Sequence, residues 1–262
     1  TESQSSPTTK LILERFLEKY RNIQHIEYDT ISSSSALDAF ENIYGLRALA
    51  DYDFSKAETI VSVDADFLSD WQGGSYSPGW SKKRVPSKEN NNSMSYHIQF
   101  ESNMTLSGAN ADNRVPANPL ELKKILVHIY SRLTGESING SLNPELDKYV
   151  NLCVDKLKSS GSKSVIISGI DDVNSQEIVL MINHYLNSEV IDVQAPRLIK
   201  KGRNSDLINM MDDLRSGKIS GMITSGVNPG YSLPDSEEFL KIFSDLEFTL
   251  SFSMKEDETS RV

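Results

Sequence analysis

The chain has 262 residues, enough for one large domain or two small ones, and its formal net charge is −10. This charge argues against nucleic acid or an anionic membrane surface as the main partner, because both repel a negatively charged protein. The single cysteine, Cys153, excludes an internal disulfide and means that this segment cannot ligate an iron–sulphur cluster alone. No apolar run reaches the roughly 18 residues that span a bilayer.

The first 140 residues alternate between segments with helical spacing of apolar side chains and short apolar runs typical of strands. In chain order these are a helix over 8–21, a strand over 25–31, a helix that begins in Ser32–Ser35 and stops at Gly45, a strand within 58–67, a strand over 95–102 and an amphipathic helix over 118–133. The stretch 73–94 is rich in Gly, Pro, Ser and Asn and is predicted to be a long loop.

The second half repeats the same alternation. Its predicted elements are a helix over 146–160, a strand over 163–169, a helix over 175–187, a strand over 190–194, a helix over 206–217, a strand over 219–226, a helix over 236–246 and a strand over 247–253. Strands that alternate with helices of ten or more residues indicate parallel βαβ units. The sequence therefore predicts an α/β fold of two consecutive doubly wound, mostly parallel Rossmann-like halves.

The best place to divide the chain is the Gly/Asn/Ser-rich stretch near residue 140. We expect a linker and first helix over 1–30, a first Rossmann-like domain over 31–140, and a second over 141–262. The second domain is expected to be truncated at its C-terminus.

Two segments carry residues with chemical potential. Asp64 and Asp66 follow a predicted strand and could hold a divalent cation, but such acids commonly cap backbone amides at strand ends. The segment 225–234 could approach a phosphate or pterin closely, although a tight strand-to-helix turn explains it better. The four histidines show no zinc-binding spacing, and no catalytic constellation stands out.

Four segments in order resemble the molybdopterin oxidoreductase (dimethyl-sulfoxide-reductase-like) family. They are 48–71, 100–119, 223–239 and 250–260. The similarity is strongest to the molybdopterin-oxidoreductase-like part of the iron–sulphur subunit of bacterial alternative complex III, a quinol:electron-acceptor oxidoreductase. This resemblance implies cofactor-binding positions at Gly226, Asn228, Pro229, Thr105 and Asp112.

Other family positions depart from the pattern. The family's glycine and Asn-Pro after the first strand are replaced by Asp64-Ala65-Asp66, where carboxylates would repel a diphosphate. The matching positions would therefore be vestigial. The resemblance then implies a non-catalytic scaffold segment of a respiratory, quinol-oxidising iron–sulphur subunit, with no active site and no metal ligands of its own.

The same resemblance implies the surroundings of this segment. Its partners would be other subunits of a membrane-bound respiratory complex, at the periplasmic face of a bacterial inner membrane. Iron–sulphur clusters would lie elsewhere in the full-length protein, and no cofactor would be bound by this segment.

Two alternatives stay open at this point. One is a working molybdopterin-binding part of an oxidoreductase, with a metal-ligating serine from Ser32–Ser35. The other is a metal-dependent sugar-nucleotide-binding enzyme that uses Asp64 and Asp66.

Overall fold

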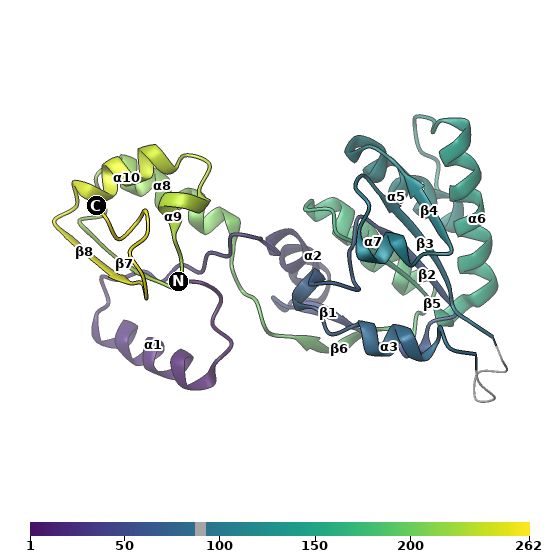
Figure 1. Cartoon of the computed structure of the whole chain (residues 1–262), viewed down its shortest axis with the longest axis horizontal. Helices are drawn as coiled ribbons and strands as arrows, with labels where there is room; N and C mark the ends of the chain where they lie inside the picture. The colour runs from purple at the N-terminus through teal and green to yellow at the C-terminus, as the bar shows by residue number, and fades with distance from the viewer. Residues whose placement is uncertain (87–92) are drawn as a thin grey trace. The chain divides into compact units, whose positions relative to one another are not determined.

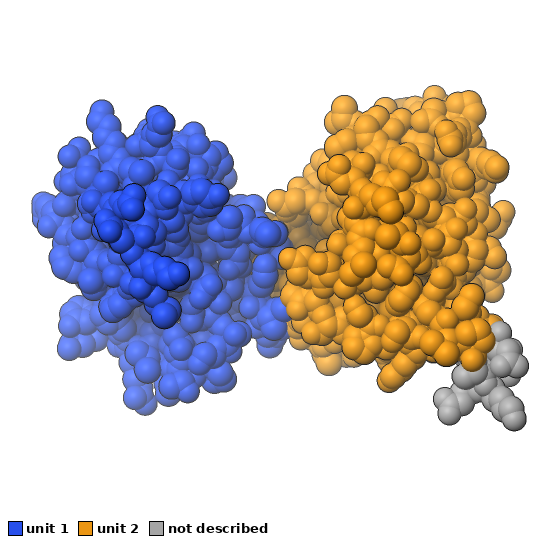
Figure 2. Space-filling view, in the orientation of Figure 1, with its two compact units in different colours: residues 1–34, 198–262 blue, residues 35–197 orange. Residues whose placement is uncertain are grey.

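The computed structural model describes residues 1–86 and 93–262 of the chain. The described chain forms two compact units, shown in different colours in Figure 2. Unit 1 consists of residues 1–34 and 198–262, and unit 2 consists of residues 35–197.

Unit 2 is built on a parallel four-stranded sheet with the strand order β4-β3-β2-β5 (Figure 1). The strands are β2 (Thr59–Val63), β3 (Tyr96–Glu101), β4 (Asn113–Pro116) and β5 (Ser164–Ser168). All residues of β2 and β5 are buried, as expected for parallel strands that are covered on both faces. Taken along the chain, this order is that of the first four strands of the Rossmann fold, with its reversal between β2 and β5.

Helices cover both faces of this sheet because side chains alternate between the two faces of each strand. One face, including Val61 and Phe100, packs against α5 (Pro119–Thr134) and α6 (Pro144–Ser160), with α7 (Val173–Tyr185) beside α5. The other face, including Ile60 and Ile167, packs against α2 (Ser34–Tyr44) and a cluster of aromatic side chains. That cluster contains Tyr52, Phe54, Phe67, Trp71, Tyr76 and Trp80.

The remaining elements of unit 2 are short. They are α2 (Ser34–Tyr44), β1 (Leu49–Tyr52), η1 (Phe54–Lys56), η2 (Trp71–Gly73), α3 (Ser77–Lys82), α4 (Leu106–Ala109), η4 (Gly161–Lys163) and β6 (Ile191–Arg197). Strands β1 and β6 pair antiparallel in a separate two-stranded sheet.

Unit 1 is a smaller α/β assembly around a parallel pair of strands, β7 and β8. Its elements are α1 (Pro7–Lys19), α8 (Asn204–Arg215), β7 (Gly221–Ser225), α9 (Pro229–Ser232), α10 (Ser236–Ser244) and β8 (Phe248–Phe252). Its core is formed mainly by side chains of α8 and α10, with Phe239 and Phe243 buried at its centre. None of the helices in the described parts of the chain is long and apolar enough to cross a bilayer.

The predicted α/β class with a parallel, Rossmann-like sheet is confirmed. The expected division near residue 140 lies inside unit 2, between α5 and α6, and β5 from beyond it joins the same sheet as β2.

Two local predictions differ from the structure. Residues 25–31 form no strand; they run as an extended segment in which the Tyr28 amide donates to the Thr1 carbonyl at 2.7 Å. The predicted loop 73–94 contains helix α3, and its residues 87–92 lie outside the described part of the chain.

Candidate functional site

The carboxyl ends of β2 and β5 form the point of the sheet where ligands of doubly wound folds bind. Here the two strand ends are in direct backbone contact. The Gly169 amide donates to the Val63 carbonyl at 2.9 Å, and a Cβ on Gly169 would lie 1.9 Å from the Asp64 carbonyl oxygen. The backbones of the two segments therefore stay in contact just beyond the strand ends, and a side chain at position 169 has no room there.

Asp64 is the polar side chain nearest to this point. Its φ of 63° is in the left-handed region, which is uncommon for a residue with a Cβ. Desolvation by the surrounding atoms and, second, the charge of Glu101 raise the pKa of Asp64, while a hydrogen bond from the Ser102 backbone acts in the opposite direction. The backbone around Asp64 is fixed by its amide, which donates to the Phe100 carbonyl at 2.7 Å.

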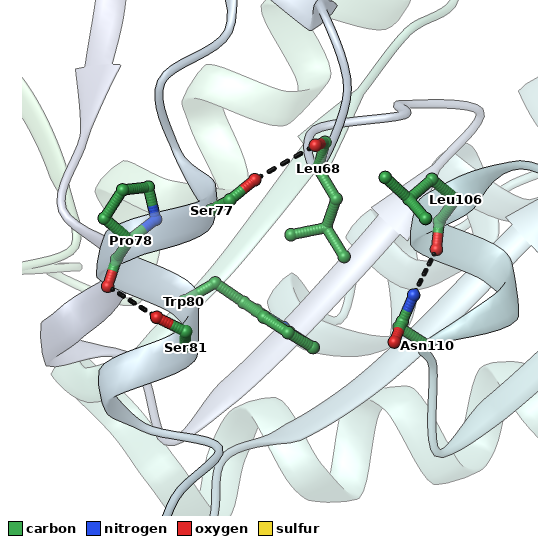
Figure 3. Close-up of a pocket in the computed structure, with 7 residues that line it drawn as sticks. All are labelled: Leu68, Ser77, Pro78, Trp80, Ser81, Leu106 and Asn110. Carbon is green, nitrogen blue, oxygen red and sulfur yellow. Dashed lines mark hydrogen bonds between the residues drawn. The ribbon is translucent and has the colours of Figure 1, made fainter.

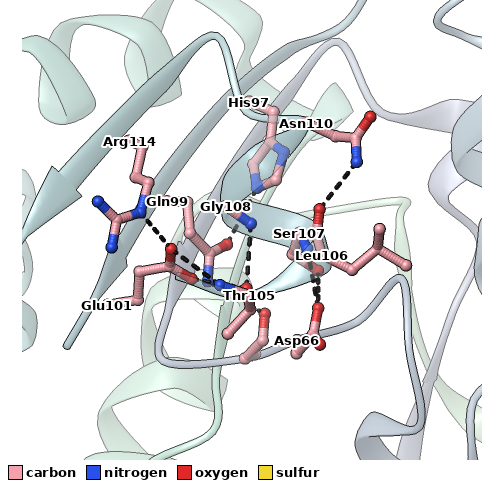
Figure 4. A network of polar contacts seen from close by, with 11 residues as sticks. Asp66, His97, Gln99, Glu101, Thr105, Leu106, Ser107, Gly108, Asn110 and Arg114 are labelled. Atoms are coloured by element: carbon pink, nitrogen blue, oxygen red, sulfur yellow. Dashed lines mark hydrogen bonds and ion pairs between the residues drawn. The ribbon is translucent and has the colours of Figure 1, made fainter. Parts of the chain in front are cut away.

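Asp66 serves as a cap for helix α4. Its carboxylate accepts from the Ser107 amide at 2.8 Å and from the Ser107 hydroxyl at 2.7 Å (Figure 4). Within residues 1–86 and 93–262, no group of three or more His, Cys, Asp or Glu side chains could hold a metal ion. The alternative of a metal-dependent sugar-nucleotide enzyme is therefore not supported, since one carboxylate of the pair is engaged by a helix terminus.

A buried carboxylate, Glu101, closes the carboxyl end of β3. Its side chain has no exposed surface and accepts from Arg114 Nε at 2.5 Å and from the Thr105 hydroxyl at 2.6 Å. The Thr105 hydroxyl in turn accepts from the Gly108 amide at 3.0 Å, so Thr105 caps α4 while it holds Glu101 (Figure 4). A Cβ on Gly108 would lie 1.9 Å from the Glu101 carboxylate, so no free space remains beside it.

His97 lies deeper on β3 and is fully buried. Its Nε2 is 3.1 Å from Gln99 Oε1, while Gln99 Nε2 donates to the Ala65 carbonyl at 3.2 Å. Gln99 Oε1 is thus an acceptor, which assigns the imidazole proton to Nε2 and leaves Nδ1 as an acceptor with no partner among the described residues. Burial lowers the pKa of His97 to about 4.

This lowered pKa predicts a loss of stability in mild acid. Between pH 6.5 and 4 the unfolded chain binds a proton at His97 that the folded chain does not, so stability falls as the pH drops through this range. From pH 7 to pH 5 we expect His97 to account for about 2 kcal/mol of lost unfolding free energy. Urea denaturation at both pH values should show a smaller difference for His97→Gln than for the parent; equal differences would contradict the prediction.

A hollow of about 500 Å³ lies between α3 and α4 (Figure 3). It is lined by Leu68, Ser77, Pro78, Trp80, Ser81, Leu106 and Asn110. The serine and asparagine side chains among these donate to backbone carbonyls: Ser77 to Leu68, Ser81 to Pro78, and Asn110 to Leu106. The indole Nε1 of Trp80 is buried and has no hydrogen-bond partner among the described residues. The hollow is therefore mainly apolar, and its serine and asparagine donors are already used.

The predicted site residues fall into two groups in different units. Thr105 lies in unit 2, as does Asp112, which accepts from Arg84 Nη1 at 2.6 Å and from the His97 amide at 2.8 Å. The other three positions, Gly226, Asn228 and Pro229, lie in unit 1.

The unit 1 group forms the turn between β7 and α9. Gly226 has a φ of 68°, which favours glycine, and Pro229 is buried at the start of α9. Asn228 donates to Glu258 and accepts from the Thr259 hydroxyl at 2.7 Å. These contacts give the residues structural partners, and their role toward a cofactor stays a prediction.

The serine run considered as a metal ligand and the single cysteine also have defined surroundings in the structure. The Ser32 hydroxyl donates to Asn204 Oδ1 at 2.8 Å, and the Ser34 hydroxyl accepts from the Asn204 amide at 3.1 Å. Cys153 is buried in the core of unit 2, and this burial raises the pKa of its thiol.

The sequence interpretation missed the residues that close the sheet edge, namely Glu101, Arg114 and Gly169. A signal for them is present in the sequence. An acid at the end of a buried strand needs a partner, and a glycine directly after a strand permits a close backbone approach.

Unit 2 is thus a Rossmann-like α/β domain in which the strand ends at the reversal are in backbone contact and the carboxylates Asp66 and Glu101 have partners within the chain. The chain matches no protein-family model and no curated protein. Among solved structures, it is similar to a chain of the crystal structure of the formyltransferase/hydrolase complex (FhcABCD) from Methylorubrum extorquens in complex with methylofuran. The TM-score is 0.61 at 12% sequence identity, over 98% of this chain and 74% of that chain.

This finding corrects the family resemblance. A solved structure that shares the fold belongs to a formyltransferase/hydrolase complex, so the predicted molybdopterin oxidoreductase family, and with it the respiratory iron–sulphur function, is wrong. The physical reason lies in the segments that carried the resemblance. They coincide with strand ends and turns, such as those after β2 and β7, and parallel α/β folds share such turns whatever their chemistry.

Proposed function

We propose that this chain is a non-catalytic subunit of a multi-subunit enzyme that transfers or hydrolyses formyl groups. The observation that carries the proposal is the fold shared with a chain of the FhcABCD complex along 98% of the present sequence. The match extends over both compact units, so it involves more than the Rossmann-like sheet that many unrelated proteins contain.

The closed sheet edge supports a non-catalytic role. A Rossmann-like enzyme needs room for its ligand at the strand reversal, and here Gly169 contacts the backbone of Asp64 directly. Glu101 is buried and accepts from three donors, namely Arg114 Nε and the hydroxyl and amide of Thr105, so it is unavailable to a substrate. In this proposal the chain acts by binding other polypeptides of the complex. The periplasmic location and the lack of a cofactor bound by this segment, both expected from the sequence, stay predictions.

Purification of the tagged full chain from its native cells tests this proposal. We expect it to copurify in constant stoichiometry with polypeptides that carry formyltransferase and hydrolase activity, and the isolated chain to show neither activity. Asp64→Asn in the complex should leave turnover unchanged, as should Asp171→Asn, a matched change at an exposed acid beyond β5. Formyl transfer by the isolated chain, or isolation without such partners, would refute the proposal.

A further inference from the structure

The parallel pair β7–β8 in unit 1 has one covered face. Met222 packs against the core formed by α8 and α10, and Thr224, two residues further along the same side of β7, is buried (β7 is labelled in Figure 1). In the parallel register, Ile223 lies beside Leu250, so these two side chains share the opposite face. Parallel strands are normally covered on both faces, and a two-stranded sheet alone is marginally stable.

The uncovered face is markedly apolar along β8. Phe248 is 55% exposed, Leu250 39% and Phe252 63%, and all three alternate onto the same side of the strand. Strands β7 and β8 contain no charged residue, and β8 contains no proline. Natural edge strands are usually protected by lysine, proline or a bulge, and β8 has neither of these two residue types.

The outer edge of β8 also has free backbone groups. The Phe248 amide donates to the Ser220 carbonyl, so the backbone groups of Phe248, and by alternation those of Leu250, face β7. The backbone groups of Thr249 and Ser251 therefore face away from β7. No hydrogen bond from elsewhere in residues 1–86 and 93–262 reaches them, whereas the outer edge of β7 is used by Glu2, whose amide donates to the Ser225 carbonyl.

The sequence of β8 is nearly symmetric about its centre. Reading outward from Leu250, Thr249 corresponds to Ser251, and Phe248 corresponds to Phe252. An antiparallel copy related by a two-fold axis at Leu250 would therefore place hydroxyl opposite hydroxyl and phenyl opposite phenyl. A two-fold interface requires this kind of self-complementarity, because each residue meets the copy's matching position.

The hydrogen-bond pattern fits this arrangement without adjustment. Antiparallel strands alternate between hydrogen-bonded and non-hydrogen-bonded pairs. Thr249 and Ser251 of the second copy would form hydrogen-bonded pairs through their outward-facing groups, and Leu250 would meet Leu250 of the second copy in a non-hydrogen-bonded pair. The first charged residues on either side of β8 are Glu247 and Lys255, so the antiparallel copy also brings opposite charges together at each end.

We propose that β8 pairs antiparallel with β8 of a second copy of this chain, with the two-fold axis at Leu250. The pairing joins two parallel pairs into one four-stranded sheet and covers the free edge of each. A pair of five-residue strands is expected to bury less than the roughly 1,200–2,000 Å² of a standard interface, so we expect a weak, reversible dimer.

Analytical ultracentrifugation of the full chain from about 1 to about 200 µM tests the oligomeric state. A monomer–dimer equilibrium is expected, and Thr249→Pro should abolish it, because proline removes an outward-facing amide that β7 does not use. The matched variant Thr249→Ala should dimerise like the parent. The proposal would be overturned if the unmodified chain stayed monomeric at about 200 µM. It would also be overturned if β8 bound only a different protein and not a second copy.

Disulfide trapping tests the register. In a non-hydrogen-bonded antiparallel pair, the Cα atoms lie about 4.5 Å apart, within reach of a disulfide. Leu250→Cys should therefore form a covalent dimer on mild oxidation, while the native Cys153 is buried.

Ile223→Cys is the matched control for this experiment. It lies on the same face of β7, three strand spacings of about 4.8 Å from its counterpart in the second copy, and should not crosslink. Crosslinking of both variants at equal rates, or of neither, would refute the antiparallel pairing at Leu250. Both outcomes are independent of the formyl-group assays, since they report only the self-association of this chain.

Discussion

Gly169→Ala is expected to destabilise unit 2 by about 3 kcal/mol or more. The added Cβ would lie 1.9 Å from the Asp64 carbonyl oxygen and 3.1 Å from the Ala65 Cα. Both atoms belong to the backbone of the segment after the central strand β2, so neither can move without disturbing the sheet. Overpacking in a rigid interior commonly costs about 1–3 kcal/mol, and a backbone clash at this distance belongs at or above the upper end.

The measurement for this prediction is the free energy of unfolding from urea denaturation, with Gly79→Ala as the matched control. A Cβ on Gly79 would meet its nearest atom, the Ser55 amide nitrogen, at an ordinary 3.5 Å, and Gly79 lies within helix α3. Alanine is favoured over glycine in a helix, so this control should be neutral or slightly stabilising. Equal stability of the two variants would show that β2 and β5 leave room at their carboxyl ends.

Much of the parallel sheet could be predicted from the sequence, because its central strands are continuous apolar runs. Strands β2 and β5 were located by runs such as Ile60–Val61 and Val165–Ile167. Strand β4 was missed because Asn113–Pro116 is short and mostly polar. The partner of β6 was not predictable, since its antiparallel pairing with β1 depends on contacts far apart in the chain, which periodicity does not encode.

The candidate site was less predictable than the fold. The turn residue Gly226 was recognised because a glycine after a strand has a local signature. Glu101 at the end of a buried strand indicated the need for a partner, but nothing local identified that partner as Arg114, the second residue of β4, because the pairing forms only in the folded chain. Asp66 was recognised as a possible cap, and the structure supplies the amide that it caps, from Ser107.

Arg114→Met is expected to destabilise the chain by about 3–5 kcal/mol. Arg114 supplies the only positive charge paired with the buried Glu101 among the described residues, with its Nε 2.5 Å from the carboxylate. Removing one partner of a buried ion pair leaves the other charge without compensation, which costs far more than the pair contributes when intact. The hydroxyl and the backbone amide of Thr105 still donate to Glu101 in this variant, but neutral donors cannot neutralise the charge.

A double variant separates the cost of the stranded charge from any loss of packing by Arg114. Glu101→Gln keeps an acceptor for the Thr105 hydroxyl but removes the charge, so adding it to Arg114→Met should restore about 2 kcal/mol or more of unfolding free energy. The cycle of parent, two single variants and double variant, followed by urea denaturation, measures this coupling. If Arg114→Met lowers the free energy of unfolding equally with Gln and with Glu at position 101, the ion pair is not what holds the end of β3. If the recovery is seen, an internal charge pair holds the carboxyl end of β3 to β4, beside the strand reversal between β2 and β5.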